Sequence, residues 1–167
     1  RILEEQNRVT AGEGYEVTGM DLLNNKVTFA LTATPREYRE GMRAVFSAVG
    51  DFEAVEVPGV LGAGQTFTGS LTCPLTDDIT LSVGFVTEES TVTQQLGQEG
   101  YLLSGAQLDM RGDLSWTVSY RDGVGSLTRL QAGVWEAGSG WYHDGSEWRE
   151  LTLEKAELRL WKNDAAP

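Results

Sequence analysis

The sequence predicts an all-β fold in which antiparallel sheets pack as sandwiches. The first observation is a sustained alternation of apolar and polar residues, which is clearest in Val27–Thr32, Phe67–Leu71, Ile79–Val83 and Leu114–Val118. A period of two places one set of side chains on one face of a sheet and the other set on the opposite face. The second observation is that turn residues interrupt the alternation roughly every 8–12 positions, which is the spacing of short sandwich strands.

Composition and charge limit the classes of partner that the chain is expected to have. Its 167 residues are 40% hydrophobic, an ordinary share for a globular protein with a packed core. The formal net charge of −12 argues against nucleic acid and against an anionic membrane surface as partners, because both attract lysine and arginine. No segment approaches 18 consecutive apolar residues, so we expect no direct membrane insertion in this segment.

The chain contains one cysteine, Cys73, and one histidine, His143. A disulfide within the chain and a structural zinc site of cysteine or mixed cysteine and histidine ligands are therefore excluded, and we expect no metal and no cofactor. Cys73 ends an alternating run, so it is interpreted as a small buried hydrophobic residue, with a nucleophilic thiol beside His143 as the alternative. The chain has no glycine-rich phosphate-binding loop, no G-x-S-x-G and no H-E-x-x-H motif.

Residues 1–14 differ from the rest of the chain and are interpreted as a stalk or linker remnant. The first eight are mostly good helix formers, and Gly12 and Gly14 end the run. We therefore expect the end of a longer helical stalk, or a frayed arm, that leads into the first strand. The chain starts with Arg1 rather than Met, which suggests an amino terminus further upstream.

Residues 15–97 are expected to form the first sandwich unit. Turn chemistry separates its strands: Asn24-Asn25 tolerates positive φ in a hairpin, and Pro35 cannot donate a hydrogen bond to a ladder. Seven short strands in about 80 residues is the number found in an immunoglobulin-like sandwich. The expected strands are Glu16–Leu22, Lys26–Thr34, Met42–Val49, Ala54–Val57, Gln65–Cys73, Ile79–Thr87 and Val92–Leu96.

Residues 98–167 are expected to form a second, smaller sandwich-like unit, so that two immunoglobulin-like or related units lie in tandem; a single continuous sandwich is the alternative. All five tryptophans lie beyond residue 100, and Asp122-Gly123 and Asp144-Gly145 are hairpin signals. Three of the tryptophans lie in alternating strands and are expected in the core: Trp116, Trp135 and Trp161. The expected strands are Leu102–Met110, Asp113–Tyr120, Leu127–Glu136, Gly140–Tyr142, Trp148–Leu153 and Ala156–Lys162.

Two stretches, Val27–Tyr38 and Phe67–Val83, resemble uncharacterised extracytoplasmic immunoglobulin-like domains of membrane-anchored surface proteins from gut-type Firmicutes. Proteins of this group have a single membrane helix, a helical stalk and a terminal immunoglobulin-like region. The resemblance therefore implies an extracytoplasmic location at the cell surface and a membrane anchor upstream of Arg1. It implies no catalytic residue.

The aromatic cluster between residues 141 and 148 is the strongest candidate for a functional site. Its ligand-binding candidates are Trp141, Tyr142, His143 and Trp148. Rings on a hairpin can stack on sugar faces or anchor a protein partner. The alternation can also put Trp141 and Trp148 on the same inner face, paired across the strands, and core packing is the favoured interpretation of these two rings. His143 is expected to be exposed at the hairpin tip, with a general base or a pH sensor as the alternative.

These observations favour a non-enzymatic extracytoplasmic module of a membrane-anchored bacterial surface protein, acting in ligand sensing, adhesion or display. Its partner would be an unknown protein or a glycan. The first alternative is a carbohydrate-binding module that uses the hairpin of Trp141 and Trp148. An enzyme domain ranks third, since the spacing of the acidic residues indicates no pair of catalytic carboxylates.

Overall fold

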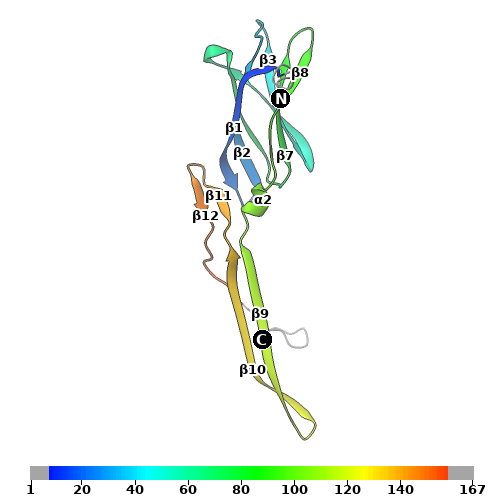
Figure 1. Ribbon diagram of the computed structural model, residues 1–167, viewed down its shortest axis with the longest axis vertical. Coiled ribbons are helices and arrows are strands. Elements are labelled where there is room, and N and C mark those ends of the chain that lie inside the picture. Colours follow the sequence, from blue (N-terminus) through cyan, green and yellow to red (C-terminus); the bar gives the residue numbers. More distant parts are fainter. Residues whose placement is uncertain (1–7, 158–167) are drawn as a thin grey trace. The chain divides into compact units, whose positions relative to one another are not determined.

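The computed structural model describes residues 8–157, which form antiparallel β-sheets with little helix and confirm the all-β class (Figure 1). The elements are β1 (Thr10–Asp21), β2 (Lys26–Pro35), β3 (Arg43–Gly50), β4 (Phe52–Pro58), β5 (Val60–Leu61), η1 (Ala63–Gln65), β6 (Phe67–Pro74), β7 (Ile79–Val86), β8 (Thr91–Glu99), α2 (Leu102–Gly105), β9 (Asp109–Arg121), β10 (Val124–Gly138), β11 (Trp141–His143) and β12 (Trp148–Glu150). They divide between two compact units: residues 8–106 with 141–149, and residues 107–140 with 150–157. The boundary expected between residues 97 and 98 stays a prediction.

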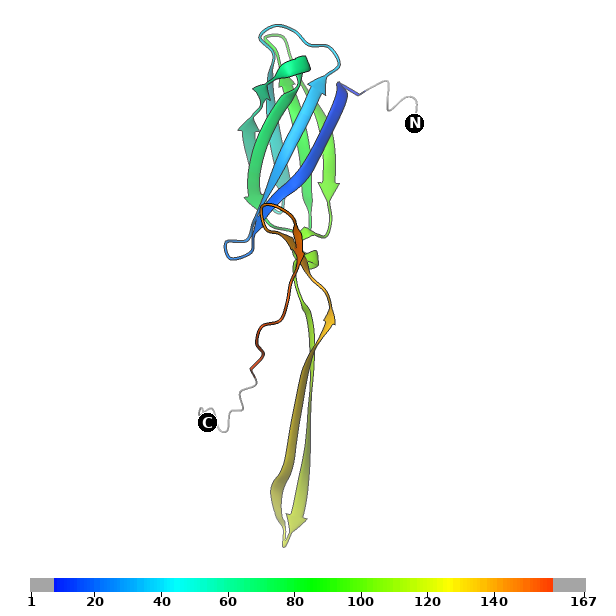
Figure 2. The same ribbon diagram turned by 90° about the vertical axis from the view of Figure 1, so that its left-hand side faces the viewer.

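Two four-stranded antiparallel sheets form the body of the first unit. One has the strand order β1-β2-β6-β5, and the other has the order β4-β3-β7-β8. The blue strands β1 and β2 lie side by side in Figure 2, in agreement with their register from Tyr15↔Leu31 to Asp21↔Lys26. Buried side chains of β2 and β6 meet those of β3 and β7 in one hydrophobic core. The first unit is therefore a two-layer sandwich.

The predicted alternation decides which side chains enter this core. Along β2, Val27, Phe29 and Leu31 are at most 1% exposed, whereas Thr28 is half-buried and Thr32 is exposed. Phe46 of β3, from the facing sheet, is equally buried. Fully burying one such side chain contributes about 1.5–3 kcal/mol, so these alternate residues hold the two layers together.

Cys73 lies on β6 with no exposed surface, which confirms that it is a small buried hydrophobic residue. Burial raises the pKa of its thiol to about 11. The reactive thiolate form is therefore scarce at neutral pH, which argues against the alternative of a nucleophilic thiol.

The first strand begins earlier than the sequence predicts. β1 starts at Thr10, so Thr10–Gly14 belong to the sandwich rather than to a stalk. β1 is an edge strand, and an edge accommodates the two glycines of this stretch; a Cβ at Gly12 would meet nothing within 4 Å. Residues 1–7, where most of the helical stalk is expected, lie outside the described residues.

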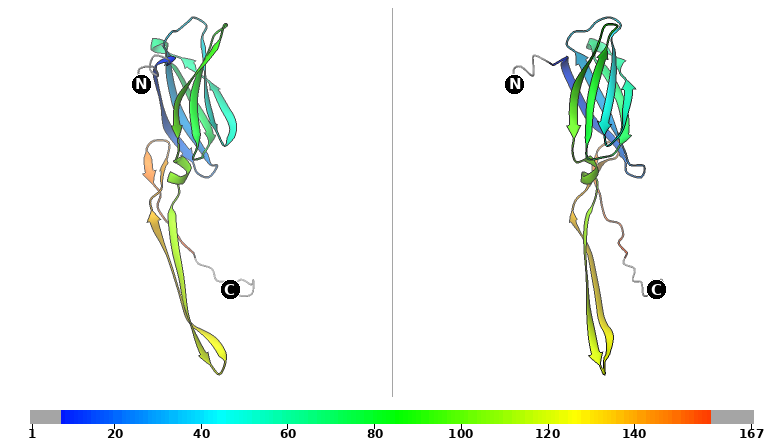
Figure 3. Two further views of the ribbon diagram at one scale, coloured as in Figure 1. Left: turned by 45° about the vertical axis from the view of Figure 1, so that its right-hand side comes forward. Right: turned by 90° about the vertical axis from the view of Figure 1, so that its right-hand side faces the viewer.

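β9 and β10 form a two-stranded antiparallel ribbon in the second unit (Figure 3). Their turn is the predicted Asp122-Gly123 pair, in which both residues have positive φ (51° and 76°), as a two-residue type I′ hairpin requires. Among residues 107–140 and 150–157 no further sheet covers the ribbon, so the second sandwich is not confirmed. The strands of this half alternate as predicted, but they form a two-stranded ribbon rather than a two-layer sandwich.

The prediction of a strand over Leu102–Met110 is wrong in its first part. Leu102–Gly105 forms the short helix α2, and β9 begins only at Asp109. Leu102 and Leu103 both pack against the core of the first unit. Adjacent residues reach one surface from a helical turn but point to opposite faces of a strand, which explains the difference.

The prediction that tryptophans of the second half lie in a core is wrong for Trp116 and Trp135. These residues are 62% and 47% exposed. Their strands alternate as predicted, but the described residues of the second unit supply no facing layer to cover them. Trp161 lies outside the described residues.

Candidate functional site

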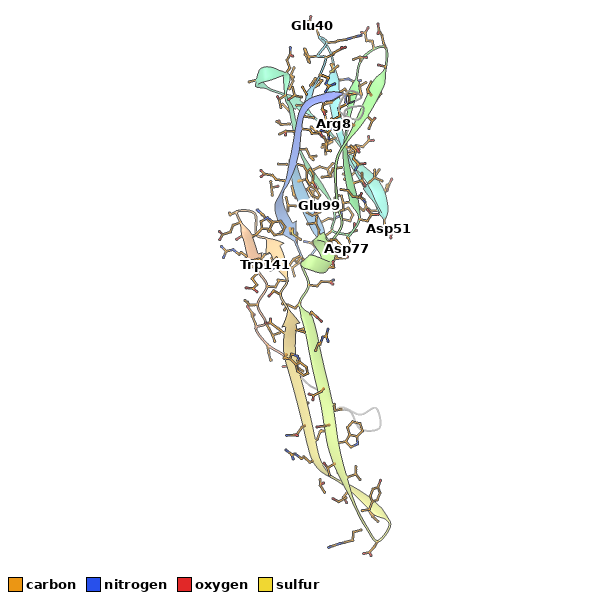
Figure 4. All side chains as sticks on the ribbon, in the orientation of Figure 1. Arg8, Glu40, Asp51, Asp77, Glu99 and Trp141 are labelled. Carbon is orange, nitrogen blue, oxygen red and sulfur yellow. The ribbon has the colours of Figure 1, made fainter. Side chains whose placement is uncertain are left out.

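The predicted aromatic site lies on a short hairpin that belongs to the first unit. β11 and β12 pair around a four-residue loop, residues 144–147. Gly145 has a φ of +102°, a conformation that favours glycine. The hairpin expected from Asp144-Gly145 is thus confirmed, and Figure 4 labels Trp141 on its first strand.

The side chain of Asp144 organises the loop. Its Oδ1 accepts hydrogen bonds from the N–H groups of Ser146 (2.7 Å) and Glu147 (2.8 Å). Its own N–H donates to the carbonyl of Glu147 (3.0 Å). Its Oδ2 accepts a hydrogen bond from Nε of Arg149, whose Nη2 also lies 3.0 Å from Oε1 of Glu147. One carboxylate therefore holds both the backbone of the loop and the start of β12.

The same contacts set the charge state of the loop. The hydrogen bond from Arg149, followed by those from the backbone of Glu147 and Ser146, holds the pKa of Asp144 well below its usual range. The hydrogen bond to Asp144 in turn raises the pKa of Arg149. Both groups are charged at neutral pH. Because the pair lies at the surface, it orders the hairpin more than it stabilises the whole unit.

His143 is 9% exposed, so the expectation of an exposed histidine at the tip is wrong. Its Nδ1 accepts a hydrogen bond from the N–H of Gly145 (3.1 Å), which assigns the imidazole proton to Nε2. Its ring meets the Trp148 ring edge to face, with centroids 5.4 Å apart and an interplanar angle of 84°. The imidazole is therefore a packing support for Trp148.

The two indoles of the site are each 48% exposed, at Trp141 and Trp148, and neither belongs to the hydrophobic core. The favoured interpretation, in which both are core residues, is therefore wrong. A period of two puts Trp141 on the same face of β11 as His143, and Trp148 meets His143 on that face. Tyr142 is half-buried and points to the other face. The structure thus brings three of the four predicted residues onto one face.

The hairpin is anchored on β1. The N–H of His143 lies 3.4 Å from Sδ of Met20, and a Cβ at Gly19 would lie 3.8 Å from the Cα of Gly145. The backbones approach closely here because both glycines lack side chains. A hairpin fixed on a sheet in this way holds its indoles in one arrangement, which lowers the entropic cost of binding.

A groove, which the sequence analysis missed, lies in the first unit where β2 ends and β8 begins, with a volume of about 580 Å³. Its lining includes the apolar side chains of Phe85 and Met42 and three arginines: Arg8, Arg36 and Arg39. Arg8 lies 3.0 Å from Glu13, and Arg39 lies 3.3 Å from Glu89. An anion in this groove would compete with these carboxylates, so the hairpin is the stronger candidate. The two arginines after Pro35, Arg36 and Arg39, are the one sequence signal that points to the groove.

Among residues 8–157, no three His, Cys, Asp or Glu side chains come together in a way that would hold a metal ion. No helix in the same part of the chain is long and apolar enough to cross a membrane. Comparisons with protein families, with curated proteins and with solved structures find no match. The resemblance to extracytoplasmic immunoglobulin-like domains therefore stays a prediction.

Proposed function

We propose that the chain is a non-enzymatic, extracytoplasmic binding or display module of a membrane-anchored bacterial surface protein, with an immunoglobulin-like sandwich as its first unit. The strand order supports this fold: β1-β2-β6-β5 follows the A-B-E-D sheet of immunoglobulin domains, and β4-β3-β7-β8 follows a C′-C-F-G sheet. The fold alone assigns no function, because it hosts many. The location depends on the resemblance of Val27–Tyr38 and Phe67–Val83.

The observation that carries the binding function is the pair of half-exposed indoles. Trp141 and Trp148 lie on a hairpin that Asp144 and Arg149 hold together and that His143 supports. Tryptophan is enriched at binding hot spots because its rigid ring buries a large area at a small loss of conformational entropy. Two such rings on a fixed hairpin favour a binding surface, with a protein as the first candidate partner.

A glycan is the second candidate ligand. The flat face of an indole offers apolar surface to the C–H groups of a sugar ring. The loop beside the indoles carries polar side chains, Ser146 and Glu147, that can exchange hydrogen bonds with sugar hydroxyls. This arrangement supports the carbohydrate-binding alternative for the same hairpin.

Titration with a glycan library and with candidate extracellular proteins, followed by calorimetry, tests this function. Trp141→Ala and Trp148→Ala should each weaken binding by about 30-fold or more, the loss typical of a hot-spot residue. Trp135→Ala is the matched control, since Trp135 is equally exposed but lies on the ribbon of the second unit. Binding that survives both hairpin substitutions would remove the hairpin from the function.

The location has a separate test. The gene sequence upstream of Arg1 should encode an apolar stretch of about 20 residues, enough for one membrane-spanning helix. A start codon directly before Arg1 would contradict an anchored protein while leaving the binding test unaffected.

A further inference from the structure

We propose that the β9–β10 ribbon is an interface for a second copy of this chain, which pairs with it face to face across a two-fold axis. The interface goes beyond the proposed function and does not depend on the ligand of the Trp141 hairpin.

The register of β9 and β10 assigns side chains to the two faces of the ribbon, because directly opposed residues of an antiparallel pair share a face. One face, here called the apolar ribbon face, carries Met110, Leu114, Trp116, Val118, Tyr120, Leu127, Leu130, Ala132 and Val134, together with Gly112, Gly125 and, opposite Met110 at one end, the charged Glu136. The other face is mostly polar; for example, Ser115 lies opposite Gln131, and Thr117 lies opposite Arg129. The ribbon is therefore amphipathic.

A β-bulge at Thr128 completes the apolar ribbon face. Leu127 pairs with Val118 and Arg129 pairs with Thr117, so Thr128 is the extra residue. In a regular strand Leu127 and Leu130 would point to opposite faces, because they are three positions apart. The hydroxyl of Thr128 donates a hydrogen bond to the carbonyl of Thr117 (3.2 Å) at this point. The bulge thus gathers apolar side chains that the sequence pattern alone separates.

The apolar ribbon face is uncovered among the described residues. Seven of its side chains are 38–78% exposed: Leu114, Trp116, Val118, Tyr120, Leu127, Leu130 and Val134. An isolated two-stranded ribbon is marginally stable in water, and a contiguous apolar patch of this size marks an interaction surface. The face therefore needs a partner.

The exposed area matches what a stable dimer needs. Large apolar side chains present on the order of 150–250 Å² when free, so the seven exposed fractions correspond to roughly 700 Å² per copy. A standard protein interface buries about 800 Å² per partner. Face-to-face pairing of two apolar ribbon faces would also build the second layer that the ribbon lacks.

The distribution of charge favours self-association through the ribbon rather than through the rest of the chain. Residues 107–140 contain four acids and three arginines, so they hold −1 of the net charge of −12 and leave −11 for the rest. Two ribbons can meet with little repulsion, whereas contacts between the acidic remainders of two copies would be opposed. A basic partner would be drawn to the acidic remainder instead of the ribbon.

The side chains of the apolar ribbon face also change in size along its length. Each cross-strand pair on this face is called a rung here. Trp116 and Leu130 form a large rung, and Leu114 and Ala132 form the smaller rung beside it. Gly112 is the next residue of β9 on the same face. When two such faces meet with their ends reversed, the large rung of each copy lies over the smaller rung of the other. A self-complementary arrangement of this kind is what a two-fold interface requires.

Sedimentation equilibrium of the full chain between about 1 and 100 μM tests the proposal, because self-association depends on concentration. The mass should rise from 18.2 kDa toward twice that value. Trp116→Arg should raise the dimer Kd by about 100-fold or more, since it buries a charge without a partner. Ser115→Arg, the neighbouring position on the polar face, is the matched control and should leave the Kd unchanged. Both positions are exposed in a single copy, so both variants should fold.

Ala132→Trp tests the two-fold register itself. A large side chain in the small rung should weaken the dimer by about 10-fold, because it overpacks the site where the partner's large rung lies. Tighter association would mean a non-specific apolar contact and would overturn the paired register. A chain that stays monomeric at the highest concentration, or that responds equally to Trp116→Arg and Ser115→Arg, would overturn the dimer, and the face would then be covered by another protein or by this chain's own segments.

Discussion

The sandwich and the ribbon share one sequence pattern and differ in burial. Leu81 and Val83 of β7 have no exposed surface, whereas Leu114 and Val118 of β9, in an equally regular alternation, are 46% and 40% exposed. β7 faces a second sheet across a core, but β9 has β10 as its one neighbour in the described part of its unit. Alternation therefore specifies the two faces of a strand, and a second layer decides whether one of them is buried.

The largest difference in stability is expected between removing one aromatic ring from the sandwich core and removing one from the ribbon. Phe29→Ala should lower the free energy of unfolding of the first unit by about 3–5 kcal/mol, because it leaves a cavity in a fully buried core. Trp116→Ala, in dilute solution, should change it by less than about 0.5 kcal/mol, as an exposed position does. Urea unfolding followed by circular dichroism measures both. Equal losses would mean that the ribbon and the sandwich share one core.

A smaller loss of stability is expected from a substitution where the edge strands of the two sheets, β1 and β8, meet. The Tyr15 ring of β1 lies so close to Gly97 of β8 that a Cβ there would overlap it, and the Tyr15 hydroxyl donates to Oε1 of Glu99 (3.0 Å). Gly97→Ala should therefore destabilise the first unit by about 1–3 kcal/mol through overpacking. Gly12→Ala is the control, because a Cβ there meets nothing within 4 Å. In thermal unfolding, Gly97→Ala should have a lower melting temperature than Gly12→Ala. Equal melting temperatures would contradict a tight contact between the sheets.

Much of the sandwich could be predicted because its strands are short, alternate regularly and end at turn residues of known chemistry. The expected strands Lys26–Thr34 and Ile79–Thr87 agree with β2 and β7 to within one residue. The two-residue strand β5 was missed, since two residues show no alternation. Strand order depends on pairings such as Val27↔Cys73, which join distant segments and leave no local signal.

The candidate site could be predicted only in outline. Asp144-Gly145 marks a hairpin because glycine tolerates the positive φ that the turn needs. The burial of His143 depends on the contact with Met20, which lies 123 positions earlier in the chain and is not encoded near the hairpin. The apolar ribbon face was hidden for a related reason, since the bulge at Thr128 shifts the register that simple alternation assumes.

The smallest effect is expected at the hairpin, which belongs to the first unit but lies outside its core. The hydrogen bond from Arg149 holds the pKa of Asp144 below the usual carboxyl value. The contribution of the charged contact is therefore fully present above about pH 4, where the unfolded carboxyl is ionised, and is lost as the pH falls through the lowered folded pKa. The NMR signal of the Asp144 side-chain carboxyl carbon, which reports the ionisation of that group itself, should stay constant from pH 7 to about pH 4 and shift only in stronger acid. A midpoint at or above the usual carboxyl value would contradict the assigned contact.

Two substitutions at Asp144 separate its charge from its hydrogen bonds. Asp144→Asn keeps an acceptor for the N–H groups of Ser146 and Glu147 but removes the charge that holds Arg149, whereas Asp144→Ala removes both. Hydrogen exchange at the Glu147 amide should be slowest in the natural chain, faster in the Asn variant and fastest in the Ala variant. Urea unfolding of the sandwich should be the same in all three, because the hairpin contributes no side chain to the core. If Asp144→Ala instead lowered the unfolding midpoint as far as Phe29→Ala does, the hairpin would have to be counted as part of the sandwich core.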